Sequence, residues 1–159
     1  MKLWGLLLLV LAGGGVGCLQ AAALHRRVRS LKTVHALVQW LGGQLRYTAA
    51  PIQRLLAEAA GEQAYSSLGF LSAFPGDWAE AVRNHARACA FTEEDVSLLC
   101  RFGEGLGKTD LEGQLAHTAQ YARLLEEQGQ EAAAVARDKG RVVCMLWVAG
   151  TAVLALLLI

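Results

Sequence analysis

The stretch most suggestive of chemistry is a glycine-rich segment that ends in Gly107-Lys108-Thr109. In phosphate-binding loops this ending places a lysine and a hydroxyl on the phosphates of a nucleotide, and a further glycine stands five residues before the last one. Here that position is Phe102. The segment also follows a predicted helix, whereas a nucleotide-binding loop follows a strand. We therefore interpret residues 103–109 as a flexible connection between two helices and predict no nucleotide site.

The other residue types that support catalysis or metal binding are scattered along the chain. No histidine has a second histidine at ligand spacing, and no Cys-x-x-Cys pair occurs. The acidic run Glu93, Glu94 and Asp95 suits the first turn of a helix, where carboxylates favour the positive end of the dipole. We therefore predict no catalytic residue, metal site or cofactor, and no enzyme. The histidines are His25, His35, His85 and His117, and the cysteines, interpreted as buried thiols, are Cys18, Cys89, Cys100 and Cys144.

The hydrophobic residues gather at the two ends of the chain. Of 159 residues 54% are hydrophobic and 18% are charged, and the mean hydropathy is +0.33. Residues 3–24 and 142–159 hold no charge. At 1.5 Å per residue these segments span about 33 and about 27 Å, close to the roughly 30 Å hydrocarbon core of a bilayer. We expect two transmembrane helices, with a soluble domain formed by residues 25–141 between them.

Basic residues next to both apolar segments predict the orientation. They lie on the side of the middle domain, so the positive-inside rule places that domain in the cytoplasm and both termini outside. We also expect them to contact anionic head groups. These residues are Arg26, Arg27, Arg29, Lys32, Arg137, Lys139 and Arg141. A net charge of +1 is lower than that of most nucleic-acid-binding proteins, and we predict no nucleic-acid partner.

An alternative interpretation makes the first apolar segment an export signal. Gly15-Val16-Gly17-Cys18 partly mimics a lipoprotein cleavage box. Cleavage there would give an extracytoplasmic lipoprotein or a secreted helical binding domain. The basic residues follow the apolar run instead of preceding it, which is the wrong side for export. The two-pass membrane protein is therefore the preferred interpretation.

Hydrophobic spacing in the middle domain is helical throughout. No segment alternates with period two, so we predict an all-α fold: an antiparallel bundle of about six helices, the first and last of which extend into the membrane. The predicted apolar stripe of the first helix consists of Leu24, Val28, Leu31, Val38 and Leu45. The predicted boundaries are a stop near Ala50, starts at Pro51, Gln63 and Asp77, a capping box from Thr92 to Asp95 with an end at Gly103, and a capping box from Thr109 to Glu112.

One longer pattern points to a known family. It reads Phe102-Gly103-x-Gly105-Leu106-Gly107-x-Thr109-Asp110 and continues to Gln114. An apolar segment leading into an arginine-rich helix, residues 47–51 and the central Trp78 accompany it. With these features nearly the whole chain resembles the stage III sporulation protein AB family, whose cytoplasmic domain is similar to the F-type platform protein of type II secretion systems.

The resemblance implies a structural role in endospore formation. Proteins of this family belong to an assembly expected to form a channel between mother cell and forespore, and this chain would lie in the mother-cell membrane. Platforms of this kind bind other subunits, including a secretion-type ATPase, and act on no small-molecule substrate. The partner-binding candidates are the motif residues Gly103, Gly105, Leu106, Gly107, Lys108, Thr109, Asp110 and Gln114.

Overall fold

The computed structural model describes the backbone of residues 2–48, 50–73 and 76–158, and the side chains of residues 21–48, 50–72, 76–140 and 142. Within that part of the chain every regular element is a helix, which confirms the all-α class. Five α-helices and two short 3₁₀ helices replace the six predicted helices. They are α1 (Lys2–Thr48), α2 (Ile52–Gly61), η1 (Gln63–Tyr65), η2 (Gly69–Ala73), α3 (Trp78–Cys89), α4 (Glu93–Gly105) and α5 (Leu111–Leu158).

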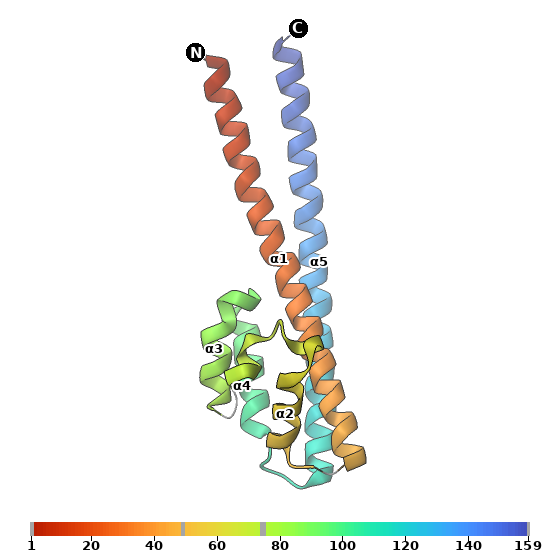
Figure 1. The fold of residues 1–159 in the computed structure, drawn as a ribbon. Coiled ribbons are helices and arrows are strands. Elements are labelled where there is room, and N and C mark those ends of the chain that lie inside the picture. Colours follow the sequence, from red (N-terminus) through yellow and green to blue (C-terminus); the bar gives the residue numbers. More distant parts are fainter. Residues whose placement is uncertain (1, 49, 74–75, 159) are drawn as a thin grey trace.

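The fold is built around the two antiparallel helices α1 and α5, which pack against each other. Figure 1 shows the short elements α2 to α4 packed against one end of this pair, while the outer parts of α1 and α5 leave the domain as two arms. Both ends of the chain lie at the far end of the arms (Figure 1). The first and last helices are therefore long and continuous, as their sequence patterns predict.

The predicted transmembrane segments form the outer parts of α1 and α5. Among the residues described with their side chains, no helix is both long and apolar enough to cross a membrane. Residues 3–24 and 142–159 lie almost entirely outside the residues with described side chains, and so does Arg141.

The core lies between the lower half of the α1–α5 pair and the short helices. Of the predicted stripe of α1, Leu31, Val38 and Leu45 are buried, while Leu24 and Val28 nearer the arms are half-buried. The three buried residues meet apolar side chains from every other α-helix. The largest fully buried contributors are Leu55 and Leu56 of α2, Phe70 and Leu71 of η2, Leu99 and Phe102 of α4, and Leu125 of α5.

The segment 63–73 departs from the predicted single helix. It forms two 3₁₀ turns, although Leu68 and Leu71 are buried as expected. The hydroxyls of Ser66 and Ser72 donate to backbone carbonyls three residues earlier, at 2.8 and 2.7 Å. Such local hydrogen bonds compete with the α-helical ladder and favour the tighter turn.

Capping residues fix most of the helix starts. The Asp77 carboxylate accepts hydrogen bonds from the amides of Ala79 and Glu80, and Thr92 and Asp95 form a capping box, both as predicted. The predicted box at Thr109 is wrong: Asp110 caps α5 instead, and its Oδ1 accepts from the Gly113 amide at 3.0 Å. The C-terminus of α4 lies at Gly105 instead of Gly103.

A buried ion pair joins α1 to the start of α4. Arg27 donates from Nε to Asp95 Oδ2 at 2.7 Å and from Nη2 to Oδ1 at 2.9 Å. The Asp95 side chain is fully buried. Burial opposes ionisation, but the hydrogen bonds and charge of Arg27 and the Thr92 amide outweigh it and hold the pKa of Asp95 below its ordinary value. Asp95 is therefore ionised in the folded protein at neutral pH.

We predict that Asp95→Asn destabilises the fold in a pH-dependent way. Asparagine keeps the capping oxygen but leaves Arg27 without its charge partner, which costs about 2–3 kcal/mol at pH 7, below the range for a fully buried pair because Arg27 keeps some exposure. A lowered folded pKa means that this stability exists above the unfolded pKa of about 3.9 and is lost as pH falls through the folded value. Urea unfolding of the full-length protein in mild detergent, followed by tryptophan fluorescence, should therefore show the gap between wild type and variant narrowing below about pH 4. A gap that stays constant from neutral to acid pH would contradict this account.

Candidate functional site

The family-like motif lies where α4 ends and α5 begins, and its first glycine is a packing residue. Phe102 is fully buried beside Gly103. A Cβ atom at Gly103 would overlap the Trp78 indole, whose Nε1 donates to the Leu99 carbonyl at 2.7 Å. The ring of Trp78 also packs edge-on against Phe102, with centroids 5.9 Å apart. Gly103 is therefore needed because the indole fills the space that a side chain would occupy.

The second glycine of the motif has the same role toward His117. A Cβ atom at Gly105 would overlap the His117 imidazole. This ring stacks on Phe102 at 5.4 Å with an interplanar angle of 4°, and Tyr121 packs against it at 4.7 Å. Its Nε2 lies 2.9 Å from the Phe102 carbonyl, which can only accept, so Nε2 carries the proton. His117 therefore stabilises the end of α4 through this hydrogen bond and its ring contacts.

Gln114 closes the motif from the inside. Its side chain is buried, and Nε2 donates to the Gly105 carbonyl at 3.0 Å and to Thr109 Oγ1 at 2.8 Å. The carbonyl oxygen Oε1 is buried and has no hydrogen-bond partner among the described residues. Gln114 thus holds the α4–α5 connection in shape and is not available to a partner protein.

The part of the motif that remains accessible is short. Gly107, Lys108, Thr109 and Asp110 are exposed, while Leu106 is half-buried. Gly107 has φ +75°, a conformation that glycine adopts without strain. Leu106 and Gly107 border a hollow of about 320 Å³, which we call the distal groove. Its lining is Pro51, Ile52, Gln53 and Leu56 of the α2 end, Gly76 and Trp78 near the start of α3, and Gly103, Leu106 and Gly107.

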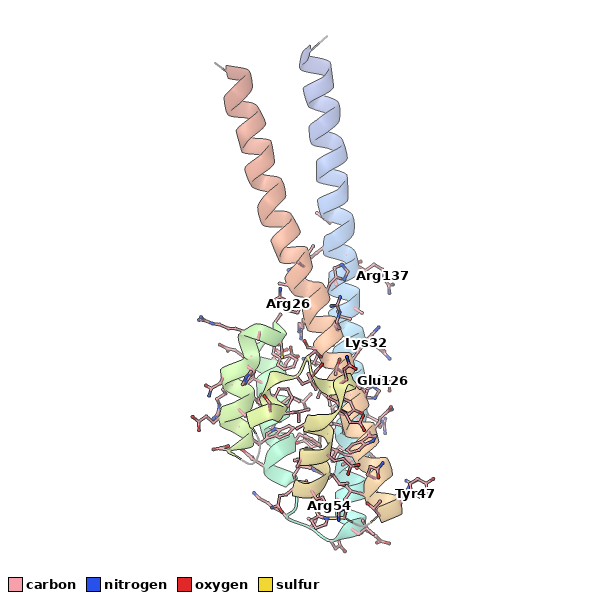
Figure 2. The ribbon with its side chains drawn as sticks, viewed as in Figure 1. Arg26, Lys32, Tyr47, Arg54, Glu126 and Arg137 are labelled. Atoms are coloured by element: carbon pink, nitrogen blue, oxygen red, sulfur yellow. The ribbon has the colours of Figure 1, made fainter. Side chains whose placement is uncertain are left out.

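The basic residues of the predicted membrane contact divide into two groups. Arg26, Arg29, Lys32, Arg137 and Lys139 are exposed. Figure 2 shows Arg26, Lys32 and Arg137 near the place where the two arms leave the domain. Arg27 differs, because its guanidinium is engaged by Asp95 and its side chain is only 13% exposed. The arrangement leaves five described cations free to meet a charged surface.

The described residues offer no cluster for metal chemistry. No three His, Cys, Asp or Glu side chains come together as metal ligands within them. Cys89 and Cys100 are free and buried, as predicted, and burial raises the pKa of the Cys89 thiol despite a hydrogen bond with Ser30. Cys18 and Cys144 lie outside the residues with described side chains.

Comparison with known proteins identifies the family. A family model for stage III sporulation protein AB matches residues 2–159. The chain belongs to this family. No curated protein and no solved structure matches it. Membership implies a role in stage III of sporulation, and it confirms the resemblance that the Phe102–Gln114 motif indicates.

Sequence reasoning missed several contacts of this stage III sporulation protein AB family member. The sequence pattern assigns Asp95 only to the first turn of a helix, but its carboxylate also binds Arg27, 68 residues earlier in the chain. His117 and Tyr121 complete an aromatic cluster with Trp78 and Phe102. No local spacing indicates these pairs. The only available signal was that glycines and an aromatic residue occur together in the motif.

We predict opposite effects of alanine at two glycines of this family member. Gly103→Ala forces the Trp78 indole to move and costs about 1–3 kcal/mol, as overpacking does elsewhere. Gly129→Ala, in the middle of α5 with nothing within 4 Å of its Cβ position, should instead stabilise the protein by about 0.5–1 kcal/mol. Urea midpoints of the two full-length variants test this. Equal or reversed effects would show that the motif glycine does not serve packing.

Proposed function

We propose that this protein is a non-enzymatic, membrane-anchored structural subunit of the sporulation apparatus between mother cell and forespore. Its helical domain lies in the mother-cell cytoplasm and binds other subunits, including a secretion-type ATPase. The observation that carries the proposal is the course of α1 and α5. They leave the domain at the same end as two continuous helices (Figure 1), and their outer parts contain the uncharged segments 3–24 and 142–159.

The charge distribution supports the anchored orientation. Both helices contribute exposed cations, and Figure 2 shows three of them, Arg26, Lys32 and Arg137, where the arms begin. The full set is Arg26, Arg29, Lys32, Arg137 and Lys139. A lysine or arginine near an anionic bilayer surface gains about 1 kcal/mol. Two apolar arms that follow such a cationic collar fit a domain that rests against the cytoplasmic leaflet.

The opposite end of the domain is the better candidate for binding partners. It holds the distal groove, the exposed residues Gly107 to Asp110 and two exposed apolar side chains, Tyr47 at 87% and Leu111 at 43%. Figure 2 shows Tyr47 pointing away from the domain at this end. Exposed aromatic and aliphatic side chains beside a hollow are typical of protein interaction sites. A partner here would meet no lipid, because the arms leave from the other end.

The first test of the proposal is topology. Tyr47→Cys and Lys2→Cys place a thiol on the domain and at the N-terminus, and an impermeant maleimide reports which side of the membrane each one faces. We expect Lys2→Cys to gain a label in intact cells and Tyr47→Cys only after permeabilisation. The unmodified chain is the control for its native cysteines. Labelling of Tyr47→Cys in intact cells would favour the exported protein instead.

The second test concerns the distal end. Tyr47→Ser combined with Lys108→Glu alters only exposed side chains, so the urea midpoint should not change. We expect the ATPase to stop co-purifying, because the loss of a hot-spot side chain costs about 2 kcal/mol of binding free energy. Spore yield should then fall at least tenfold. Arg83→Glu, an exposed change on α3, is the matched control. A normal spore yield from the stable double variant would exclude this end as the docking surface.

A further inference from the structure

One side of the α1–α5 pair is uncovered within the domain. The elements α2 to α4 pack on the other side (Figure 1). Along the uncovered side runs a hollow of about 460 Å³, which we call the seam groove. It is lined from α1 by Gly42, Gly43 and Arg46 and from α5 by Leu115, Ala119 and Ala122, among others.

Several small residues of both helices line the seam groove, and Gln39 and Arg123 line it on the side toward the arms. Gly42 has no room for a side chain, since a Cβ atom there would lie 3.2 Å from Thr118 Oγ1. Gly43 faces open space, with no atom within 4 Å of its Cβ position. Together with Ala119 and Ala122 it leaves room for another helix to approach closely.

Charged residues of opposite sign flank this middle section. Lys32 and Arg46 lie on α1, and Glu112 and Glu126 lie on α5; all four are exposed. Figure 2 shows Lys32 and Glu126 on the same side of the pair. Among the described side chains, the one ion pair joins Arg27 to Asp95. None of the four charges on this side therefore forms an ion pair with another described side chain.

The cations of α1 and the carboxylates of α5 lie at similar positions along the common axis of the two helices; we call this position the level of a residue. Gly42 and Thr118 lie at the same level because they are in contact. Lys32 is 10 residues from Gly42 toward the arms and Glu126 is 8 residues from Thr118 in the same direction, about 15 and about 12 Å. Toward the distal end, Arg46 and Glu112 are 4 and 6 residues away, about 6 and about 9 Å. Each cation thus lies within about 3 Å of the level of one carboxylate.

We propose that the seam groove binds a second copy of this chain in the same orientation, about a two-fold axis parallel to the pair. Rotation about that axis places α1 of one copy opposite α5 of the other and keeps every level unchanged. Lys32 then faces Glu126 of the partner subunit, and Arg46 faces Glu112 of the partner subunit. The small side chains of both copies meet between these pairs in a four-helix arrangement.

The shared orientation rests on the proposed function, in which both copies are anchored through arms that leave at one end. An inverted copy would reverse the levels and place Lys32 near the partner's distal end, away from Glu126. The two pairs of opposite charges on each helix pair therefore select the parallel arrangement. The seam groove has no role in the proposed function, and the second copy is its proposed partner.

The first experiment measures self-association of the full-length protein in mild detergent by light scattering over a concentration series. Gly43→Leu fills the open space without a clash inside the chain, and leucine favours helix over glycine. We expect at least a tenfold rise in the dimer Kd with no loss in the urea midpoint. Gly61→Leu, also in open space but at the end of α2, is the matched control and should dimerise like wild type.

The second experiment tests the charge pairs between copies. One chain carries Lys32→Glu and Arg46→Glu, and a second, differently tagged chain carries Glu112→Lys and Glu126→Lys. Each variant alone should be monomeric, because α1 and α5 then repel across the interface. The mixture should form dimers that co-purify through both tags, since every cross-copy pair is again of opposite sign. Attraction within one chain cannot produce this pairing of unlike variants.

Two results would overturn the proposal: a wild type that stays monomeric across the series, or mixed variants that fail to pair while both are folded. In the first case, loss of spore formation in Gly43→Leu would assign the groove to a helix of a different protein. The pairing of variants does not depend on where the arms lie. A failure of the membrane proposal would therefore show in the cysteine labelling and leave this test unaffected.

Discussion

The fold depends on one buried charge and its neutralisation. Asp95 is fully buried at the first turn of α4, and it can remain ionised there because Arg27 of α1 binds both of its oxygens. The same carboxylate accepts the Thr92 amide, so the start of α4 and its attachment to α1 use one group. This attachment lies near the place where α1 leaves the domain, and it fixes the level at which the α3–α4 hairpin meets the arms.

The other end of that hairpin is held by ring packing instead of charge. Trp78, Phe102, His117 and Tyr121 form a continuous aromatic cluster, and two glycines of the family motif leave the space that the indole and the imidazole fill. Most residues of the motif therefore serve the packing of the domain. Among the predicted partner-binding residues, only Gly107, Lys108, Thr109 and Asp110 are exposed.

Local features of the sequence predicted what local physics decides. Pro51, Asp77 and the Thr92–Asp95 box each act within a few residues, and the helix boundaries that depend on them are confirmed. The 3₁₀ turns of residues 63–73 and the cap at Asp110 were missed, because each choice depends on competing hydrogen bonds of similar strength. The Arg27–Asp95 pair and the aromatic cluster could not be predicted from the sequence, because tertiary packing brings together residues that are far apart in the chain.

The two proposed interaction surfaces follow from the same geometry without obstructing each other. The seam groove runs along the α1–α5 pair, so a second copy placed there would extend the assembly sideways, which in the proposed anchored protein is the plane of the membrane. The distal groove lies at the end of the pair, where α4 turns into α5, and a partner bound there would extend the assembly along the pair, away from the arms. Because a two-fold axis parallel to the pair points both distal ends in one direction, each dimer would present two equivalent docking ends. A partner that contacts both ends gains the effective concentration of a linked second site.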